Sequence, residues 1–311
     1  MHDVESTSLA AEAVAGLLAT PAHASPKFFY DALGSRLFDA ITELDEYYPT
    51  RTEAAIVQAS LGAIAAAVRQ TLGTDYSLID LGAGNCAKAA SLFEALAPRR
   101  YVALDISVDF LRQSLEALQR LHPGMAMAGV GLDFSARLAL PAALCPGAAL
   151  VFYPGSSIGN FEPSAALRLL REARALSNGG MLLIGVDLVK PAAVLEAAYD
   201  DSLGVTAAFN LNLLRHLNRL IDSDFHLREW QHFALFNPTE SRIEMHLRAR
   251  HAITVRWPNG ERRFLPGECI HTESSYKWRR EDFESLLTDA GFGKVSTWTD
   301  PNQWFGLFLA H

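Results

Sequence analysis

The sequence has 311 residues, of which 50% are hydrophobic and 20% are charged, so it can form one large domain or two smaller ones with a substantial core. Its net charge of -8 argues against non-specific nucleic-acid binding, which requires a basic surface. Three scattered cysteines fit neither a disulfide framework nor a zinc site, and we see no basic leader and no stretch long enough to span a membrane, so we expect a reduced, cytoplasmic protein.

The N-terminal part of the sequence predicts three helices. The first covers residues 5–18, is rich in alanine and leucine, and is followed by Pro21 and Pro26, which break it. A short amphipathic helix is expected over 35–44. The segment Thr50-Arg51-Thr52-Glu53 then fits a capping box and should open a long helix that runs to about Gln70.

The middle of the sequence alternates between strands and helices. Runs such as 148–152 are apolar throughout, as expected for strands that helices cover on both faces. The alternation predicts a parallel, doubly wound α/β sheet of the Rossmann-like kind. The expected strands are 77–81, 100–105, 125–132, 148–153 and 181–186, and the expected helices are 87–96, 108–121 and 164–176.

The pattern changes after Lys190-Pro191. Helical sequence over about 192–221 is followed by β segments, which include 242–255 and a hairpin at Asn259-Gly260. We interpret this region as an insertion that packs with the N-terminal segment into a second, α+β lobe that binds the substrate.

The last part of the sequence returns to the sheet. A helix is expected over 280–290, followed by strands over 294–299 and 304–310. The turn between these strands is too short for a parallel crossover, so they should form an antiparallel hairpin. The expected cofactor-binding domain therefore consists of 52–189 with 277–311, and the expected substrate-binding lobe consists of 1–51 with 190–276.

Three strand ends carry a candidate adenosine site. Gly82-Ala83-Gly84 follows the first strand of the sheet, where glycines let the backbone approach a ligand. Asp105 ends the second strand and can accept both ribose hydroxyls, while Asp133-Phe134 follows the third and offers an acceptor and a ring to adenine. Extended to Ala87, the turn also fits a nicotinamide enzyme. The closing antiparallel hairpin favours a class I methyltransferase, with S-adenosyl-L-methionine as cofactor.

Several segments resemble the histidine Nα-methyltransferase family of ergothioneine biosynthesis, whose members convert L-histidine to hercynine, its Nα-trimethyl betaine. They run over nearly the whole chain, and the tyrosine-rich segment at 46–53 is the most specific of them. The similar segments are Lys27-Phe28-Phe29-Tyr30-Asp31, Gly34-Ser35-Arg36-Leu37-Phe38, Glu46-Tyr47-Tyr48-Pro49-Thr50-Arg51-Thr52-Glu53, Gly155-Ser156-Ser157-Ile158-Gly159-Asn160, Tyr199-Asp200-Asp201, the run 204–210, and Arg242-Ile243-Glu244-Met245.

The resemblance implies a set of site residues. Those expected to contact S-adenosylmethionine are Gly82, Lys88, Asp105, Asp133 and Phe134. Those expected to contact L-histidine are Tyr47, Asn160, Tyr199, Met245 and the segment Glu273, Ser274 and Ser275, with Tyr30 near the amine and Met245 against the imidazole. Asp45 and Ser274 depart mildly from the family pattern.

The residue types fit this chemistry but allow other interpretations. Asn160 follows the fourth strand, and its amide suits an amino-acid head, although it also fits a plain turn. Glu273 and Ser275 are two apart in an expected strand and should share a face, where they can bond an imidazole or simply meet solvent. Tyrosines often serve packing alone, and Lys88 equally fits an exposed helix surface.

The remaining residues limit the chemistry. The histidines lack metal-ligand spacing, so we expect no metal, and His232 is expected at the surface or at a cap. Cys86 has no activating histidine near it in sequence. We expect a monomer that binds a small molecule. The candidate catalytic residues are Asn160 and Tyr30. The alternative substrate is another amino acid, such as tryptophan; a non-catalytic adenosine-binding protein is disfavoured because candidates for both sites are present.

Overall fold

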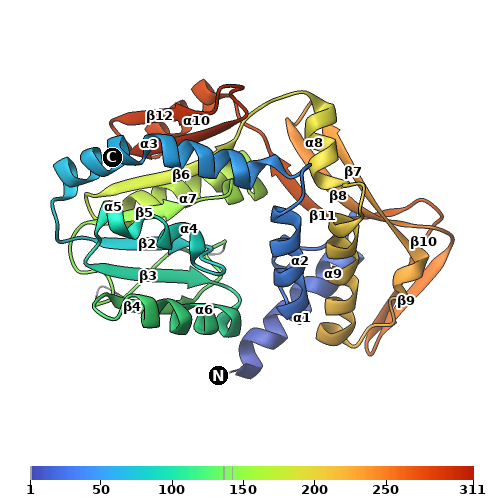
Figure 1. Ribbon diagram of the computed structural model, residues 1–311. Coiled ribbons are helices and arrows are strands. Elements are labelled where there is room, and N and C mark those ends of the chain that lie inside the picture. Colours follow the sequence, from blue (N-terminus) through green and yellow to red (C-terminus); the bar gives the residue numbers. More distant parts are fainter. Residues whose placement is uncertain (1, 136, 142) are drawn as a thin grey trace. The chain divides into compact units, whose positions relative to one another are not determined.

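The computed structural model describes residues 2–135, 137–141 and 143–311, except for the side chains of residues 2–8 (Figure 1). Contacts divide the chain into two compact units. The first consists of residues 1–48 and 190–275, and the second consists of residues 49–189 and 276–311.

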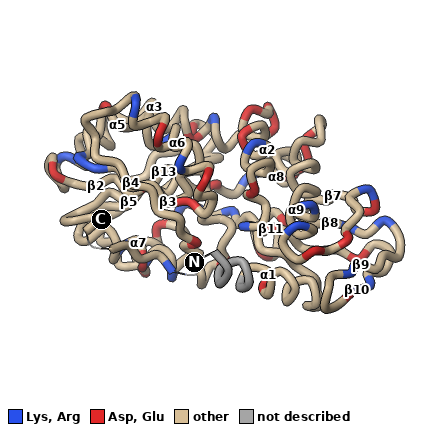
Figure 2. The backbone as a smooth tube through the Cα atoms, turned by 90° about the horizontal axis from the view of Figure 1, so that it is seen from below, with Lys and Arg blue, Asp and Glu red and all other residues tan. Residues whose placement is uncertain are grey.

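The first unit joins the N-terminal segment to the inserted region. Strand β1 (Ala22–His23) pairs in parallel with β11 (Cys269–Tyr276), and the four-stranded sheet has the order β1-β11-β8-β7. Acidic and basic residues are interspersed along the backbone of both units (Figure 2). The other elements of this unit are α1 (His2–Leu18), η1 (Pro26–Phe29), α2 (Ala32–Thr42), α8 (Ala192–Tyr199), α9 (Val205–Ile221), η3 (Leu227–Glu229), β7 (Trp230–Asn237), β8 (Arg242–Ala249), β9 (Ile253–Trp257) and β10 (Gly260–Phe264).

The second unit is built on a seven-stranded sheet of order β12-β13-β6-β5-β2-β3-β4. Neighbours from β6 to β4 are parallel, whereas β13 is antiparallel to both β6 and β12. This confirms the predicted Rossmann-like sheet with an antiparallel C-terminal hairpin. The strands are β2 (Ser77–Leu81), β3 (Arg100–Asp105), β4 (Ala126–Gly131), β5 (Ala149–Tyr153), β6 (Met181–Asp187), β12 (Val295–Thr299) and β13 (Phe305–Ala310).

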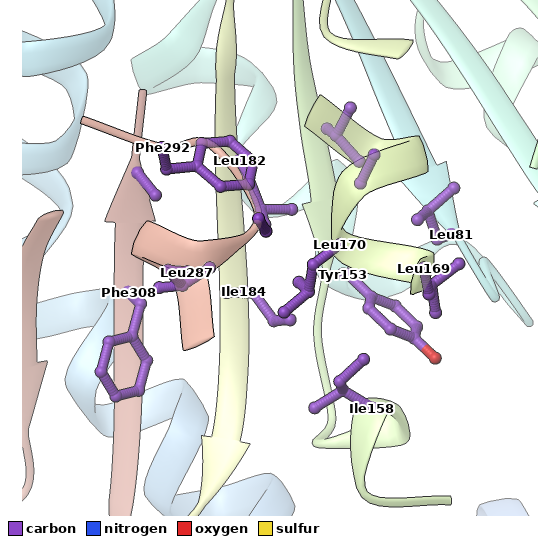
Figure 3. Packing of buried hydrophobic residues seen from close by; sticks show 14 of the residues in the cluster. Leu81, Tyr153, Ile158, Leu169, Leu170, Leu182, Ile184, Leu287, Phe292 and Phe308 are labelled. Carbon is purple, nitrogen blue, oxygen red and sulfur yellow. The ribbon is translucent and has the colours of Figure 1, made fainter. Parts of the chain in front are cut away.

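Helices cover both faces of this sheet, which explains why its inner strands are apolar on both sides. Residues of α7 (Pro163–Leu176) and α10 (Arg280–Asp289) join one core cluster, in which Leu170, Ile184 and Leu287 are buried (Figure 3). Residues of α3 (Tyr48–Leu72), α4 (Ala87–Ala90), α5 (Phe93–Leu96) and α6 (Val108–Leu121) join the cluster on the other face.

Helix α3 corrects two expectations. Among the described residues it is the one helix long and apolar enough to cross a membrane by length and composition, because it is rich in alanine; the expectation that no stretch approaches that length is therefore wrong. One such helix is weak evidence for a membrane span, and Ile56, Ile64 and Val68 of α3 belong to the core of the second unit. The helix also begins at Tyr48, so the predicted capping box lies inside it.

Three predicted elements are each divided in the structure. The expected helix 87–96 forms α4 and α5, separated at Ser91, whose hydroxyl donates to the Lys88 carbonyl (2.7 Å). The expected helical region 192–221 forms α8 and α9, separated by a turn in which the Gly204 φ is +76°. The expected β segment 242–255 forms β8 and β9, interrupted at residues 250–252.

Candidate functional site

The glycine turn of the second unit follows β2 directly. Gly82 and Gly84 have φ angles of +70° and +51°, in the left-handed region that favours glycine. The Gly82 and Ala83 amides both donate to the Leu104 carbonyl (2.9 Å each), which fixes the turn against the end of β3. The turn therefore lies at the carboxyl edge of the sheet, where folds of this kind bind ligands.

Asp105 lies beside this turn. One carboxylate oxygen accepts from the Gly84 amide (2.9 Å), and the other accepts from the Ser107 amide (2.8 Å). The side chain is half-buried, and each carboxylate oxygen can accept a further hydrogen bond. The structure thus brings two sequence-predicted positions, the glycine turn and Asp105, together.

Phe134 lies beside the same glycine turn, and Asp133 precedes Phe134 in the chain. A Cβ added to Gly82 would lie 3.9 Å from the tip of the Phe134 ring. That ring meets Tyr153 of β5 edge-on, with centroids 5.8 Å apart. The Asp133 carboxylate accepts from both the amide (3.0 Å) and the hydroxyl of Ser135. One edge of the sheet therefore combines the backbone turn at Gly82, the Asp105 carboxylate and the Phe134 ring.

Lys88 forms an ion pair that the sequence did not predict. Its Nζ lies 2.6 Å from Glu53 Oε2, and the side chains are 41% and 4% exposed. Glu53 Oε1 accepts from the Gly155 amide (2.8 Å). The carboxylate that was expected to cap its own helix therefore joins α3 to α4 and to the loop after β5. The one sequence signal for this contact was a glutamate near the start of the helix that begins at Tyr48.

A buried polar group lies beneath the turn. The Tyr101 hydroxyl donates to Asp80 Oδ2 (2.7 Å), and burial raises the pKa of Asp80 to about 7 even though this hydrogen bond opposes the shift. Burial also raises the pKa of the Cys86 thiol to about 11. Because a thiolate is the reactive form of cysteine, Cys86 is a poor nucleophile at neutral pH.

Asn160 ends the loop that follows β5. Gly155 and Ser156 have φ angles of +76° and +58°, and the chain then forms the short 3-10 helix η2 (Ser157–Asn160). The Ser156 hydroxyl accepts from the Asp187 amide on β6 (2.8 Å). The Asn160 side chain is half-buried and belongs to the same unit as the glycine turn.

In the first unit, the predicted tyrosines belong to one aromatic cluster. Tyr30 meets Phe38 edge-on (5.9 Å between centroids), Phe38 meets Tyr47 (6.1 Å), and Tyr47 meets Tyr199 (6.4 Å). Phe209 of α9 packs against both Tyr30 and Phe38. Packing of α2 against α9, together with the contact between Tyr47 and Tyr199 of α8, thus gathers three tyrosines from separate parts of the sequence.

Tyr199 also reaches β11. Its hydroxyl donates to the Ser275 hydroxyl (2.7 Å), and both Ser275 and Glu273 are buried. Ser274 between them bonds His271 Nε2 through its hydroxyl (3.1 Å). The structure therefore places the Glu273 carboxylate and the Tyr199 and Ser275 hydroxyls in the buried part of this unit, which excludes the alternative interpretation that this strand face simply meets solvent.

Met245 and His232 lie within the same sheet. Met245 on β8 is buried, and its carbonyl accepts from the Thr272 hydroxyl of β11 (3.0 Å). His232 was expected at the surface or at a cap, but it is buried between the Tyr199 carbonyl (2.8 Å from Nε2) and the Asn210 amide (2.8 Å from Nδ1). Burial lowers the pKa of His232 and favours the neutral ring, which can donate to the carbonyl and accept from the amide.

Within the described residues, no group of three or more His, Cys, Asp or Glu side chains is arranged to hold a metal ion. The three cysteines are free thiols. The candidate chemistry therefore involves the glycine turn with Asp105 in one unit, and the aromatic cluster with Glu273 and Ser275 in the other.

The strand order, the antiparallel hairpin and the acidic residue bonded to the glycine turn define a class I methyltransferase that uses S-adenosylmethionine. Over residues 9–311 the chain matches the family described as "Histidine-specific methyltransferase, SAM-dependent", and it belongs to that family.

The chain is also similar to several named relatives and to one solved structure. The chain is 42% identical to a histidine N-alpha-methyltransferase of Mycolicibacterium smegmatis, over 99% of this chain and 96% of the relative. It is 39% identical to a protein of the same name from Mycobacterium tuberculosis, with the same coverage. It is 30% identical to ergothioneine biosynthesis protein 1 of Neurospora crassa, over 90% of this chain but 32% of that one. A solved S-adenosylmethionine-dependent methyltransferase from Clostridium acetobutylicum superposes with a TM-score of 0.46 at 14% identity, covering 89% of this chain and 95% of that one.

Proposed function

We propose that the protein transfers three methyl groups in succession to the α-amine of L-histidine, which yields hercynine in the first step of ergothioneine biosynthesis. The observation that carries the choice of substrate is the buried Glu273, on the strand whose Ser275 hydroxyl bonds Tyr199 (2.7 Å). An imidazole has two ring nitrogens, and a carboxylate with a hydroxyl can bond both. The family match and the two mycobacterial relatives support the same substrate.

The residues around the glycine turn suit S-adenosylmethionine. A side chain at Gly82 would project toward Phe134, so the absence of one leaves room beside the ring for an adenosine. We assign the ribose hydroxyls to Asp105, the adenine amino group to Asp133, the adenine face to Phe134, and the methionine carboxylate to Lys88. When bound, the cofactor supplies an electrophilic methyl group on a sulfonium.

The amino-acid substrate is assigned to the remaining candidates. Glu273 and Ser275 bond the imidazole, with Ser274 as the neighbouring backbone contact and Met245 against the ring. Asn160 and Tyr199 hold the amino-acid head. Tyr30 and Tyr47 supply hydroxyls and, as methyl groups are added, aromatic faces that tolerate a methylammonium cation.

The reaction does not require a covalent bond between the protein and either reactant. The cofactor held by these residues would supply its methyl group to the amine lone pair, so that the new N–C bond would replace the C–S bond and the bonding electrons would stay on sulfur. Asn160 holds the amine in line, which is the main contribution to the rate in such a displacement. Before the next transfer the amine loses a proton, through Tyr30 or water, and rotates. Each methyl group replaces one N–H, so the site must hold the carboxylate and imidazole rather than every N–H of the amine.

We also propose a cytoplasmic, monomeric enzyme whose partner is a small molecule rather than a nucleic acid. The three free thiols suit a reducing compartment. The net charge of -8 is unfavourable for binding a polyanion.

Incubation with S-adenosylmethionine and each common amino acid in turn tests the substrate. Mass spectrometry should show methyl additions to histidine and not to tryptophan. Asn160→Ala should slow all three transfers, whereas Ser114→Ala serves as a control in the same unit and should not, because the Ser114 hydroxyl bonds the Phe110 carbonyl of its own helix (2.9 Å). Methylation of tryptophan in preference to histidine would reject the assignment and favour the related substrate class.

A further inference from the structure

The loop that carries Asn160 is anchored at two consecutive residues. The Gly155 amide donates to Glu53 Oε1 (2.8 Å), and the Ser156 hydroxyl accepts from the Asp187 amide (2.8 Å). Both Gly155 and Ser156 have left-handed backbones, which is an uncommon conformation for serine. The path of the chain into Asn160 therefore depends on partners from α3 and β6 as well as on local preference.

The same glutamate holds Lys88. Glu53 Oε2 lies 2.6 Å from Lys88 Nζ, while Oε1 bonds the Gly155 amide. A carboxylate that is 4% exposed is costly to bury unless its oxygens are paired, and here each oxygen has a partner. The ammonium has three donors, so this ion pair leaves others for a ligand while it fixes the position of the group.

The fold leaves a specific space for this carboxylate. A Cβ added to Gly185 of β6 would lie 2.0 Å from Glu53 Oε1, so any larger residue there would displace the carboxylate. Strand β6, helices α3 and α4, and the loop after β5 therefore meet at one side chain within the second unit. A helix cap or a surface ion pair would not require contacts from all four of these segments.

We propose that Glu53 is a positioning residue for methyl transfer, which fixes the Lys88 ammonium and the loop of Asn160 through one carboxylate. It acts through these two groups. This inference rests on the proposed function, because Lys88 is assigned to the cofactor and Asn160 to the amine.

Two substitutions separate the two bonds. Glu53→Gln keeps an oxygen for the Gly155 amide but places an uncharged amide against Lys88, whereas Glu53→Ala removes both partners. Ser156→Ala is the matched control, since it removes the other anchor of the loop and leaves Lys88 paired. Gly185→Ala should displace the carboxylate without altering Glu53 itself, although the added Cβ would also lie 2.9 Å from the Phe305 ring, which must shift as well. Folding is checked by circular dichroism, S-adenosylmethionine affinity by calorimetry, and kcat and the histidine KM by initial rates.

Each variant has a distinct expected result. Glu53→Gln should weaken S-adenosylmethionine binding about fivefold, as for a partly exposed charged pair, with the histidine kcat retained. Glu53→Ala and Gly185→Ala should show the same loss and also lower kcat by about tenfold or more, because in-line geometry is lost. Ser156→Ala should lower kcat alone. A merely structural glutamate would lower thermal stability without this division between binding and turnover.

The outcomes distinguish the inference from the function on which it rests. Folded Glu53→Ala protein with unchanged cofactor affinity and kcat would overturn the inference, as would equal effects of Glu53→Gln and Glu53→Ala on every constant. If the wild-type protein binds S-adenosylmethionine but does not methylate histidine, the proposed function fails. The Lys88 part of the inference is then still decided by the calorimetry.

Discussion

Replacing Asp105 tests the cofactor end of the site quantitatively. Its carboxylate accepts from the Gly84 amide (2.9 Å) and the Ser107 amide (2.8 Å), and we propose that it also accepts from the ribose hydroxyls. A hydrogen bond to a charged group contributes about 1.5–3 kcal/mol, so its loss in Asp105→Ala should weaken S-adenosylmethionine binding about 10- to 150-fold.

A pair of ligands separates the ribose contact from the loosened turn. Loss of the Gly84 hydrogen bond affects any adenosine ligand, whereas loss of the hydroxyl contact affects only a ligand with hydroxyls. Competition against S-adenosylhomocysteine should show that wild-type protein prefers adenosine to 2′,3′-dideoxyadenosine and that Asp105→Ala abolishes this preference. A folded Asp105→Ala protein that keeps the wild-type preference would refute the reasoning, whatever its absolute affinity.

Three further predictions concern other parts of the molecule. Glu273→Gln should raise the histidine KM about 10-fold or more through the loss of a charge-assisted hydrogen bond, with S-adenosylmethionine affinity unchanged in calorimetry. Tyr199→Phe removes one buried hydrogen bond to the Ser275 hydroxyl, so urea denaturation should show a loss of about 0.5–1.5 kcal/mol. The pKa of Asp80 rises from 3.8 to about 7 on folding, so the folded state retains a proton that the unfolded chain releases, and the free energy of unfolding should fall as pH rises through that window. Asp80→Asn should remove this fall, and an unchanged pH dependence would contradict the assignment.

For several elements of the second unit, the sequence predicted both the first and the last residue correctly. The strands at 77–81 and 100–105 and the helix at 108–121 were predicted with the bounds that the structure shows. The two strands are mostly apolar and the helix is amphipathic, so local pattern and tertiary burial agree. The meeting of Asp105 with the glycine turn follows as well, because the carboxyl ends of adjacent parallel strands lie at the same edge.

The contacts of Glu53 could not be predicted from the local sequence. A capping box and a buried tertiary ion pair can use the same glutamate, and the local pattern favours the cap. The partners that decide the outcome, Lys88 and Gly155, are 35 and 102 positions away. The Tyr199–Ser275 hydrogen bond likewise spans 76 positions, and no local signal pairs these hydroxyls. Buried polar partners of this kind depend on the packing of whole elements.

The position and number of the methyl groups on the product test the central claim most directly. Nuclear magnetic resonance of the product formed from L-histidine with excess S-adenosylmethionine should show three equivalent methyl groups on the α-nitrogen and none on the imidazole. Mono- and dimethylhistidine, supplied separately, should both be converted to the same end product. A methyl group on a ring nitrogen, or a reaction that ends at monomethylhistidine, would contradict the account.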